Sequence, residues 1–316
     1  MISRSVFRVA ACLSAVLLVV ACVGEKSRTG TSSDITYHYA TLAPQSASLP
    51  ERQSQANSER WSAAVDASVY AGLMQMLGVG SHCLDFSATM TPDIERLAAA
   101  HPDMLLVSAY DGVDTKRYER LAIPVVLCRD FLEPSPLARA EWMRYFGRLW
   151  CVADKADSLF AVVENGYRQH MVSDSSSSKK PVVLFDTLYG SLWYQPTPQS
   201  TIGQMVADAG GALPFCSDQR GGSVAYSAEQ VLMEAKDAEV WIIRTTADLM
   251  LADLKALNPV YGEFKAFREG RVFAVNTLEV PFYEETPFRP DWLLSDFCQI
   301  LRRESPAKLR YFRKLE

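Results

Sequence analysis

The sequence contains few of the side chains that bind bare metal ions. Its four histidines, His38, His82, His101 and His170, are scattered and form no HxxxH pair. None of its seven cysteines forms a CxxC pair, and the five that follow residue 22 are widely spaced. Because a zinc site needs several imidazole or thiolate ligands that converge, this pattern disfavours a zinc or manganese binder. It also excludes a regular disulfide framework, although it leaves open whether any two cysteines pair.

Signatures of common enzymes and of nucleic-acid binding are also lacking. The segment GVGSH at 78–82 does not end in the GK[ST] of a phosphate-binding loop, and no GxSxG nucleophile turn occurs. The net charge of −5 provides no excess of positive charge that would attract a phosphate backbone. We therefore expect neither an enzyme nor a nucleic-acid-binding protein.

No apolar run is long enough to cross a membrane, but the N-terminus is typical of a secretion signal. Arg4 and Arg8 precede an apolar run over 9–21, which is shorter than the ~20 residues of a spanning helix. The run ends in VVAC, which resembles the lipobox of bacterial lipoproteins, whose cysteine carries lipid. We expect a signal peptide over 1–21, lipid on Cys22 and a polar tether over 22–34, so that the protein lies outside the cytoplasm on a membrane surface. The alternative is an ordinary signal peptide that contains a cysteine.

The rest of the chain predicts two α/β lobes. Short apolar strands alternate with helices over 35–134 and again over 181–316, which is typical of parallel sheets covered on both faces. Between them, 135–180 has apolar residues at helical spacing and then a serine-rich loop, so we expect one long helix or two in series. The predicted fold is two doubly wound lobes bridged by a long helix, with ligand at the strand ends between the lobes.

Two glutamates occupy matching positions in the two predicted lobes. Asp93 and Ser227 are good N-cap residues, and Glu95 and Glu229 follow each of them by two positions. A single carboxylate in a first helical turn is explained by the helix dipole alone. Two of them, one in each lobe and each before a strand, suggest a matched pair of charged side chains on one surface.

The order and spacing of several segments carry a family resemblance. They are DIERLAAAHPDMLLVSAYDG, YERLAIPVVLCRDFLEPSPLARAEWMRYFGRLW, KADSLFAVVE, STIGQMVADAGGALPF, SAEQVLMEAKDAEVWII and VPFYEETPFRPDWLLSDFCQIL. Over roughly 61–306 the chain resembles the substrate-binding lipoproteins of ABC importers for iron chelates and cobalamin, the FecB/BtuF-like periplasmic-binding family. The resemblance implies two α/β lobes bridged by a stiff helix, and a permease dimer with a cytoplasmic ATPase as partner. It also implies that Glu95 and Glu229 pair with arginines of the permease. The irregular segment 41–60 departs from the family pattern.

Candidate ligand-binding residues lie at the expected strand ends. Aromatic side chains suit the flat face of a chelate or macrocycle, and arginines suit its carboxylates. The tyrosines could also reach the iron of haem. The Trp193–Tyr194 pair is the strongest candidate, because we expect GSLWYQP to form a loop. The full set is Trp193, Tyr194, Tyr110, Asp111, Arg129, Arg220, Arg244, Phe282 and Tyr283.

These observations together predict a monomeric, lipid-anchored binding protein that performs no covalent chemistry. It would capture a metal chelate, with a ferric siderophore or haem ranked before cobalamin, and deliver it to an ABC permease. No cofactor is expected, because the chelate is the ligand. Two alternatives stay open: a lipoprotein enzyme that inserts metal into a tetrapyrrole, and a surface scavenger of chelates that has no transporter.

Overall fold

The computed structural model describes residues 61–88, 93–110, 114–172, 179–218, 220–302 and 308–316. The predicted signal peptide, tether and Cys22 lie outside these residues. Within them the chain divides into two compact units: unit 1 holds 61–163 and Tyr283–Phe288, and unit 2 holds Glu164–Phe282 and Arg289–Glu316. This division differs from the expected boundaries, which placed all of 181–316 in the second lobe.

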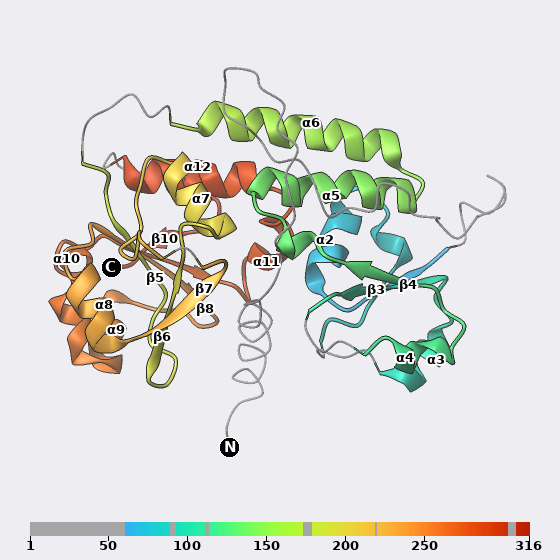
Figure 1. Ribbon diagram of the computed structural model, residues 1–316, viewed down its shortest axis with the longest axis horizontal. Coiled ribbons are helices and arrows are strands. Elements are labelled where there is room, and N and C mark those ends of the chain that lie inside the picture. Colours follow the sequence, from blue (N-terminus) through green and yellow to red (C-terminus); the bar gives the residue numbers. More distant parts are fainter. Residues whose placement is uncertain (1–60, 89–92, 111–113, 173–178, 219, 303–307) are drawn as a thin grey trace. The chain divides into compact units, whose positions relative to one another are not determined.

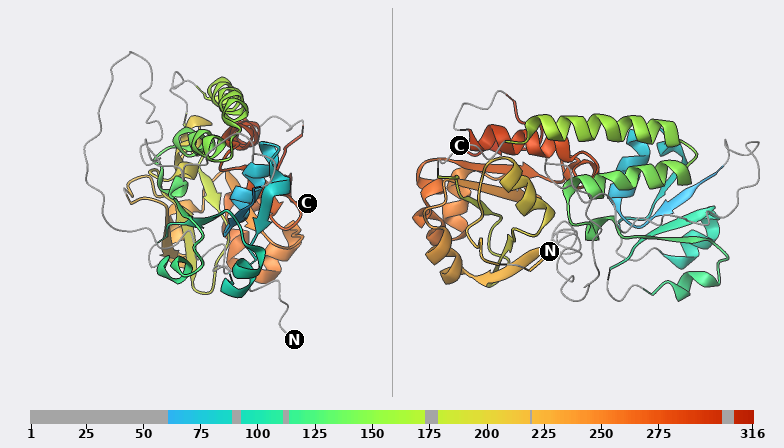
Figure 2. Two further views of the ribbon diagram at one scale, coloured as in Figure 1. Left: turned by 90° about the vertical axis from the view of Figure 1, so that its right-hand side faces the viewer. Right: turned by 45° about the horizontal axis from the view of Figure 1, so that its top comes forward.

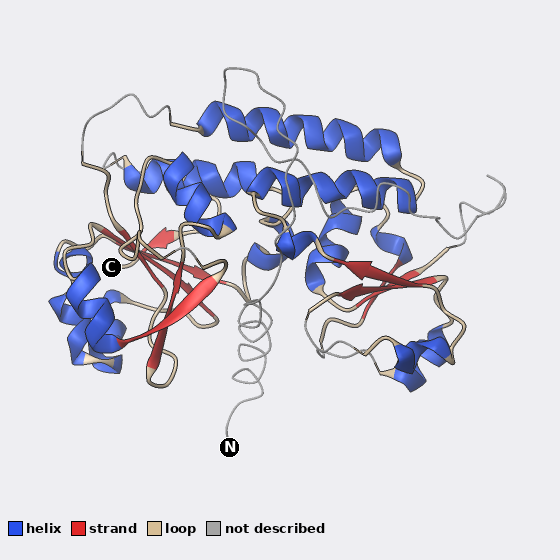
Figure 3. Ribbon diagram, in the orientation of Figure 1, coloured by secondary structure: helices blue, strands red, loops and turns tan. Residues whose placement is uncertain are grey.

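Unit 1 is built on a sheet of four parallel strands in the order β2-β1-β3-β4. Figure 3 shows its strands alternating with helices. Its elements are β1 (Ala63–Val65), α2 (Ser68–Met76), η2 (Gly80–His82), β2 (Cys83–Asp85), α3 (Ile94–Ala100), β3 (Met104–Ser108), α4 (Lys116–Glu119), β4 (Val125–Cys128), η3 (Asp130–Leu132) and α5 (Pro136–Leu149).

Both faces of the two central strands of this sheet, β1 and β3, are buried. Alternate residues of its strands, such as Ala64 and Leu105, pack with Leu97 of α3 and Tyr118 of α4. In these two strands the side chains that point the other way, Ala63, Val65, Met104 and Leu106, are also buried. Burial on both faces explains why these strands read as continuous apolar runs in the sequence.

Unit 2 has a four-stranded sheet in the order β10-β9-β8-β5, in which only β10 is antiparallel. A second sheet pairs β6 with β7 in antiparallel register. The elements are β5 (Val183–Phe185), β6 (Leu192–Pro196), α7 (Thr201–Asp208), β7 (Ser223–Ser227), α8 (Ala228–Ala235), β8 (Val240–Thr245), α9 (Leu251–Leu257), η4 (Pro259–Glu263), α10 (Lys265–Arg268), β9 (Val272–Asn276), α12 (Pro290–Leu301) and β10 (Arg313–Lys314).

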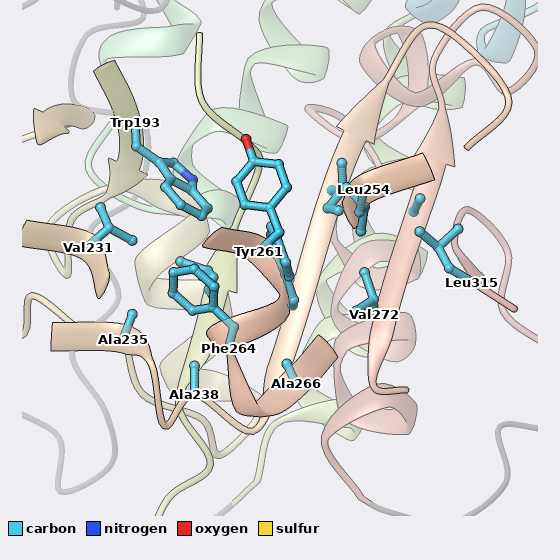
Figure 4. Packing of buried hydrophobic residues seen from close by; sticks show 14 of the residues in the cluster. Trp193, Val231, Ala235, Ala238, Leu254, Tyr261, Phe264, Ala266, Val272 and Leu315 are labelled. Atoms are coloured by element: carbon cyan, nitrogen blue, oxygen red, sulfur yellow. The ribbon is translucent and has the colours of Figure 1, made fainter. Parts of the chain in front are cut away.

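The core of unit 2 also lies on both sides of its larger sheet. On one side Trp241 and Val272 pack with residues of α8, α9 and α10, as Figure 4 shows in part. On the other side Phe185 contacts Phe297 of α12, with ring centroids 6.1 Å apart. Figures 1 and 2 show α8, α9 and α10 grouped together and α12 apart from them.

The predicted helical bridge consists of two helices in series, one of the two forms expected from the sequence. Ser135 caps α5 by accepting a hydrogen bond from Ala138 N–H at 3.1 Å, and α5 ends before Cys151, whose φ is +57°. The second helix, α6 (Ala153–His170), contains the division between the units. The chain crosses between the units again within α11 (Phe282–Glu285), a short helix whose first residue belongs to unit 2 and whose other residues belong to unit 1.

The segment around Trp193 is a strand and not the expected loop. Trp193 and Gln195 alternate with Tyr194 along β6 and are fully buried. Trp193 donates a hydrogen bond to the Phe185 carbonyl at 2.8 Å, and the Gln195 amide both donates to Phe185 O and accepts from Phe185 N–H. These side chains therefore satisfy the backbone at the free edge of β5, which would otherwise be buried without partners.

Trp193 is consequently a core residue, which corrects its assignment as a ligand contact. Its ring lies 5.4 to 5.8 Å from those of Trp241, Tyr261 and Phe264, and Figure 4 shows it within this aromatic group. Phe282 is corrected for the same reason, since it is buried against Tyr311 and Phe312.

We predict that Trp193→Ala lowers the free energy of unfolding by about 3 to 5 kcal/mol, because it opens a cavity in a packed core. The control is Leu192→Ala on the neighbouring, 40% exposed position, which should change stability by about 0.5 kcal/mol or less. Urea denaturation followed by circular dichroism measures both. Equal stability of the two variants would contradict the assignment of Trp193 to the core.

Candidate ligand and docking sites

The carboxyl ends of β1, β3 and β4 bring a polar cluster together at one edge of the unit 1 sheet. Asp66 directly follows β1, and Ser108 ends β3. The Asp66 carboxylate accepts from Ser108 N–H at 2.8 Å and from Ser108 Oγ at 3.1 Å. These bonds tie the ends of two strands together, and they leave Asp66 only 8% exposed.

A second carboxylate, Asp130, follows β4 at the same edge. It is fully buried and accepts from the Tyr70 hydroxyl at 2.8 Å and from Arg139 Nε at 3.0 Å. The partly exposed Arg139 balances its charge, as a buried carboxylate requires. Asp130 is therefore a structural support under the strand ends.

Two of the predicted ligand residues lie at this edge. Tyr110 is half-buried two residues after β3, and Arg129 is exposed directly after β4. Burial raises the pKa of the Tyr110 hydroxyl, and the nearby Asp66 charge adds to this effect. The third predicted residue, Asp111, lies outside the described residues. Asp66 was not among the predicted ligand residues, although a lone aspartate at the end of an apolar strand was a signal for it.

The corresponding edge of the unit 2 sheet holds an ion pair. The carboxylate of Asp186, which follows β5, accepts from Arg244 N–H at 3.0 Å, from Arg244 Nε at 3.1 Å and also from its Nη2. Trp241 Nε1 donates to the Asp186 carbonyl at 2.7 Å, and these bonds hold Asp186 at a φ of +52°. Arg244 therefore reaches the strand ends as part of a neutral pair.

The second predicted arginine of unit 2 is paired in the same way. Arg220 Nε donates to Asp218 at 2.9 Å, and Arg220 remains about half exposed. The hydrogen bonds from Arg220 hold the pKa of Asp218 well below its usual range. The Tyr226 hydroxyl also donates to Asp218, and its ring stacks on Phe215 at 3.7 Å. Neither Arg220 nor Arg244 therefore adds positive charge that is not balanced by an aspartate.

The remaining predicted ligand residues occupy different surroundings. Tyr194 is half-buried in β6, where the strand alternation points it away from the core side of Trp193. Tyr283 is half-buried in α11 and belongs to unit 1. Of the predicted set, Tyr110 and Arg129 share one sheet edge, whereas Arg244 lies at the edge of the other sheet.

The two predicted docking glutamates are exposed on their helices, as their positions suggested. Asp93 caps α3 by accepting from Glu95 N–H at 2.8 Å, so Glu95 lies in the first turn of that helix. Ser227, the predicted N-cap, forms a capping box with Gln230 at the start of α8. The helix start lowers the pKa of Glu229, chiefly through its own backbone N–H, so this carboxylate stays ionised at neutral pH.

The described residues contain neither a metal-binding cluster nor a membrane-spanning helix. In them no group of three or more histidine, cysteine, aspartate or glutamate side chains is placed to hold a metal ion. The five cysteines after residue 22 are free thiols. None of the helices in this part of the chain is both long and apolar enough to cross a membrane.

Comparison with known proteins identifies the family. Residues 55–277 match the family model described as periplasmic binding protein, which confirms the resemblance found in the sequence. Two curated relatives are uncharacterised lipoproteins of Methanocaldococcus jannaschii, 26% and 23% identical over 70% and 68% of this chain. The chain spans about half the length of these relatives, 53% and 57%.

Solved structures share the fold. A periplasmic haem-binding protein from Pseudomonas aeruginosa aligns with a TM-score of 0.64 at 15% identity, over 81% of this chain and 98% of its own. A protein of an ABC-type Fe³⁺-hydroxamate transport system from Saccharomonospora viridis aligns with a TM-score of 0.58 at 18% identity, over 76% and 92%. These likenesses confirm the α/β fold class. The family consists of transport components and not of enzymes, which agrees with the sequence prediction.

The Asp66 cluster predicts a specific pH dependence. Burial raises the pKa of Asp66 from 3.8 to about 6, and the nearby Asp130 adds to this. The folded protein therefore keeps a proton between about pH 4 and 6 that the unfolded chain releases, so the stability from this group is lost as pH rises through 6. Asp66→Asn should remove this loss, which amounts to about 3 kcal/mol at most.

Denaturation of the wild type and the variant between pH 4 and 7.5 measures the effect. We expect the stability of Asp66→Asn relative to wild type to increase with pH over this range. A constant difference between the two proteins would show that folding does not raise the pKa of Asp66 and would contradict the assignment.

Proposed function

This chain belongs to the periplasmic binding protein family, and we propose that it is the substrate-binding component of an ABC importer for a metal chelate. The observation that carries the proposal is the pair of capped, exposed glutamates, Glu95 and Glu229, one on each unit of a fold of this family. A carboxylate held outward at a helix start, as each of these is, suits pairing with an arginine of a partner. The proposed partner is a permease dimer driven by a cytoplasmic ATPase.

The proposed ligand is a ferric siderophore or haem, with cobalamin ranked after them. Two proteins of similar fold are described as binding haem and as belonging to Fe³⁺-hydroxamate transport. In this chain, half-buried Tyr110 and exposed Arg129 offer an aromatic surface, a hydroxyl group and a positive charge at one strand edge. The neutral Arg244–Asp186 pair offers both donors and acceptors. Each of these two strand edges, taken by itself, carries groups that suit a chelate of modest charge with an extended aromatic or amide surface.

We further propose that the protein is held outside the cytoplasm by lipid on Cys22. The support is the lipobox-like VVAC at 19–22 and the lipoprotein names of the two curated relatives. Mass spectrometry of the membrane-extracted protein tests this: a diacylglyceryl group on Cys22 is expected, and an unmodified cysteine would contradict it.

Ligand titration of the full chain tests the ligand class. Calorimetry with ferric hydroxamate, ferric citrate and cyanocobalamin, and Soret absorbance with haem, should give saturable binding for one chelate. Tyr110→Phe and Arg129→Gln should each weaken that binding by about tenfold, because each loses one polar contact of about 1.4 kcal/mol.

The matched controls for this titration are Tyr189→Phe, in the exposed turn before β6, and Arg268→Gln, at the exposed end of α10. They should bind like wild type. Absence of binding to all four chelates would contradict the proposed ligand class, and unchanged binding by both test variants would contradict the proposed site.

Neutral replacement of both glutamates tests delivery to the permease. Glu95→Gln combined with Glu229→Gln should reduce cellular uptake of the ligand at least tenfold, because each change removes the charge that pairs with the permease. Ligand affinity should be unchanged, since both side chains are exposed on helix starts. The control Glu269→Gln, another exposed glutamate, should take up ligand normally. Normal uptake by the double variant would refute the docking role.

A further inference from the structure

Three exposed apolar residues, Tyr189, Leu192 and Met233, lie on the segments next to Glu229, and we call these three and Glu229 the Glu229 patch. Tyr189 and Leu192 flank a tight turn that leads into β6, and Met233 lies one helical turn after Glu229 on α8. Leu192 pairs in register with Ser227, the residue that caps α8. Figure 1 shows the turn before β6 next to the start of α8.

The apolar members of the patch are exposed. Met233 is 73% exposed, Tyr189 53% and Leu192 40%. The turn between the last two contains Gly190 at a φ of +62°, and a side chain built there would meet nothing within 4 Å. A projecting turn is ordinarily polar, so a tyrosine and a leucine on either side of one are poorly explained by the fold of unit 2. A cluster of this kind indicates a contact surface.

We propose that the Glu229 patch is a mixed contact surface for the permease, in which Tyr189, Leu192 and Met233 shield the Glu229 carboxylate from water once bound. The inference rests on the proposed function and extends it from one charge pair to an apolar surface. Apolar side chains around a charged contact exclude water from it, and a carboxylate attracts a guanidinium more strongly in the resulting lower dielectric.

The charge of the patch favours a basic protein surface over a membrane or a second copy of this chain. The exposed side of α8 and its C-terminal end carries Glu229, Glu234 and Asp237 against a single amine on Lys236. Surfaces that bind anionic lipid carry an excess of lysine and arginine instead. Two copies facing each other through this acidic surface would repel. A permease loop that presents arginine among apolar residues fits both features.

Unit 1 shows a smaller version of the same arrangement. Ile94, next to Glu95, is 36% exposed, and alanines occupy positions 98 and 99, three and four residues after Glu95 on α3. These side chains offer much less apolar area than the Glu229 patch. We therefore expect the apolar part of the permease contact to lie chiefly on unit 2.

Photo-crosslinking of the full chain in the cells that produce it tests the inference. The photoreactive residue p-benzoylphenylalanine replaces Leu192, Met233 or Gln230, the neighbour of Glu229, and it replaces Leu257 of α9 as a control of matched exposure at 69%. We expect positions 192, 233 and 230 to be linked to one membrane protein, identified by mass spectrometry as an ABC permease subunit. Position 257 should give no such product.

The outcomes separate this inference from the proposed function. A permease product from position 230 without one from 192 or 233 would overturn the apolar contact while the docking role stands. Products from 192 and 233 that contain only lipid or a second copy of this chain would also overturn it. No permease product from any position would overturn the proposed function itself.

Uptake measurements provide a second readout. Leu192→Ser combined with Met233→Ser should lower uptake about tenfold and leave ligand affinity unchanged, whereas Leu257→Ser should have no effect. Circular dichroism verifies that the variants are folded. Normal uptake by the folded double variant would contradict the inference.

Discussion

Each unit depends on the burial of short parallel strands from both sides. Alternate side chains of β5, β8 and β9 pack against α8, α9 and α10 on one face and toward α12 on the other. Because parallel strands all point the same way, this burial gathers their carboxyl ends at one edge. The same packing orients α3 and α8, whose first turns carry Glu95 and Glu229. Candidate ligand groups and candidate docking groups are therefore both consequences of how the sheets are covered.

Charge at these strand ends is arranged in compensated pairs. Asp130 is balanced by Arg139 in unit 1, and Asp186 by Arg244 in unit 2. A pair of this kind is rigid and polar without a large net charge, so it can position a ligand through hydrogen bonds and does not attract one over long distance. Of the predicted ligand arginines, Arg129 is the one that forms no ion pair with a described residue. It is exposed directly after β4. This distribution suits a chelate whose own charge is largely neutralised by its metal.

Much of the fold could be predicted from the sequence because local signals agreed with burial. The alternation of apolar strands with helices in each unit, and the caps at Asp93 and Ser227, were predicted correctly. The pairing of β6 with β7 was missed, because Trp193 and Gln195 are buried by a contact with the edge of β5, and such a contact between distant segments leaves no local pattern.

The candidate site was less accessible to sequence reasoning for a related physical reason. The sequence around an arginine near a strand end is the same whether its side chain faces a ligand or an aspartate. The ion pairs of Arg244 with Asp186 and of Arg220 with Asp218 could therefore not be predicted. Aromatic residues are equally ambiguous, since Trp193 and Phe282 fill cores while Tyr110 remains half-buried at a strand edge. Exposure, and not residue type, separates these cases.

The central claim is that this binding protein supplies a metal chelate to an importer. Uptake of ⁵⁵Fe-labelled ferric hydroxamate and of haem by cells that lack the gene, with and without its restoration, tests this claim most directly. We expect the deletion to abolish high-affinity uptake of one of these chelates and the wild-type chain to restore it. Unchanged uptake of both, together with unchanged uptake of cobalamin, would contradict it.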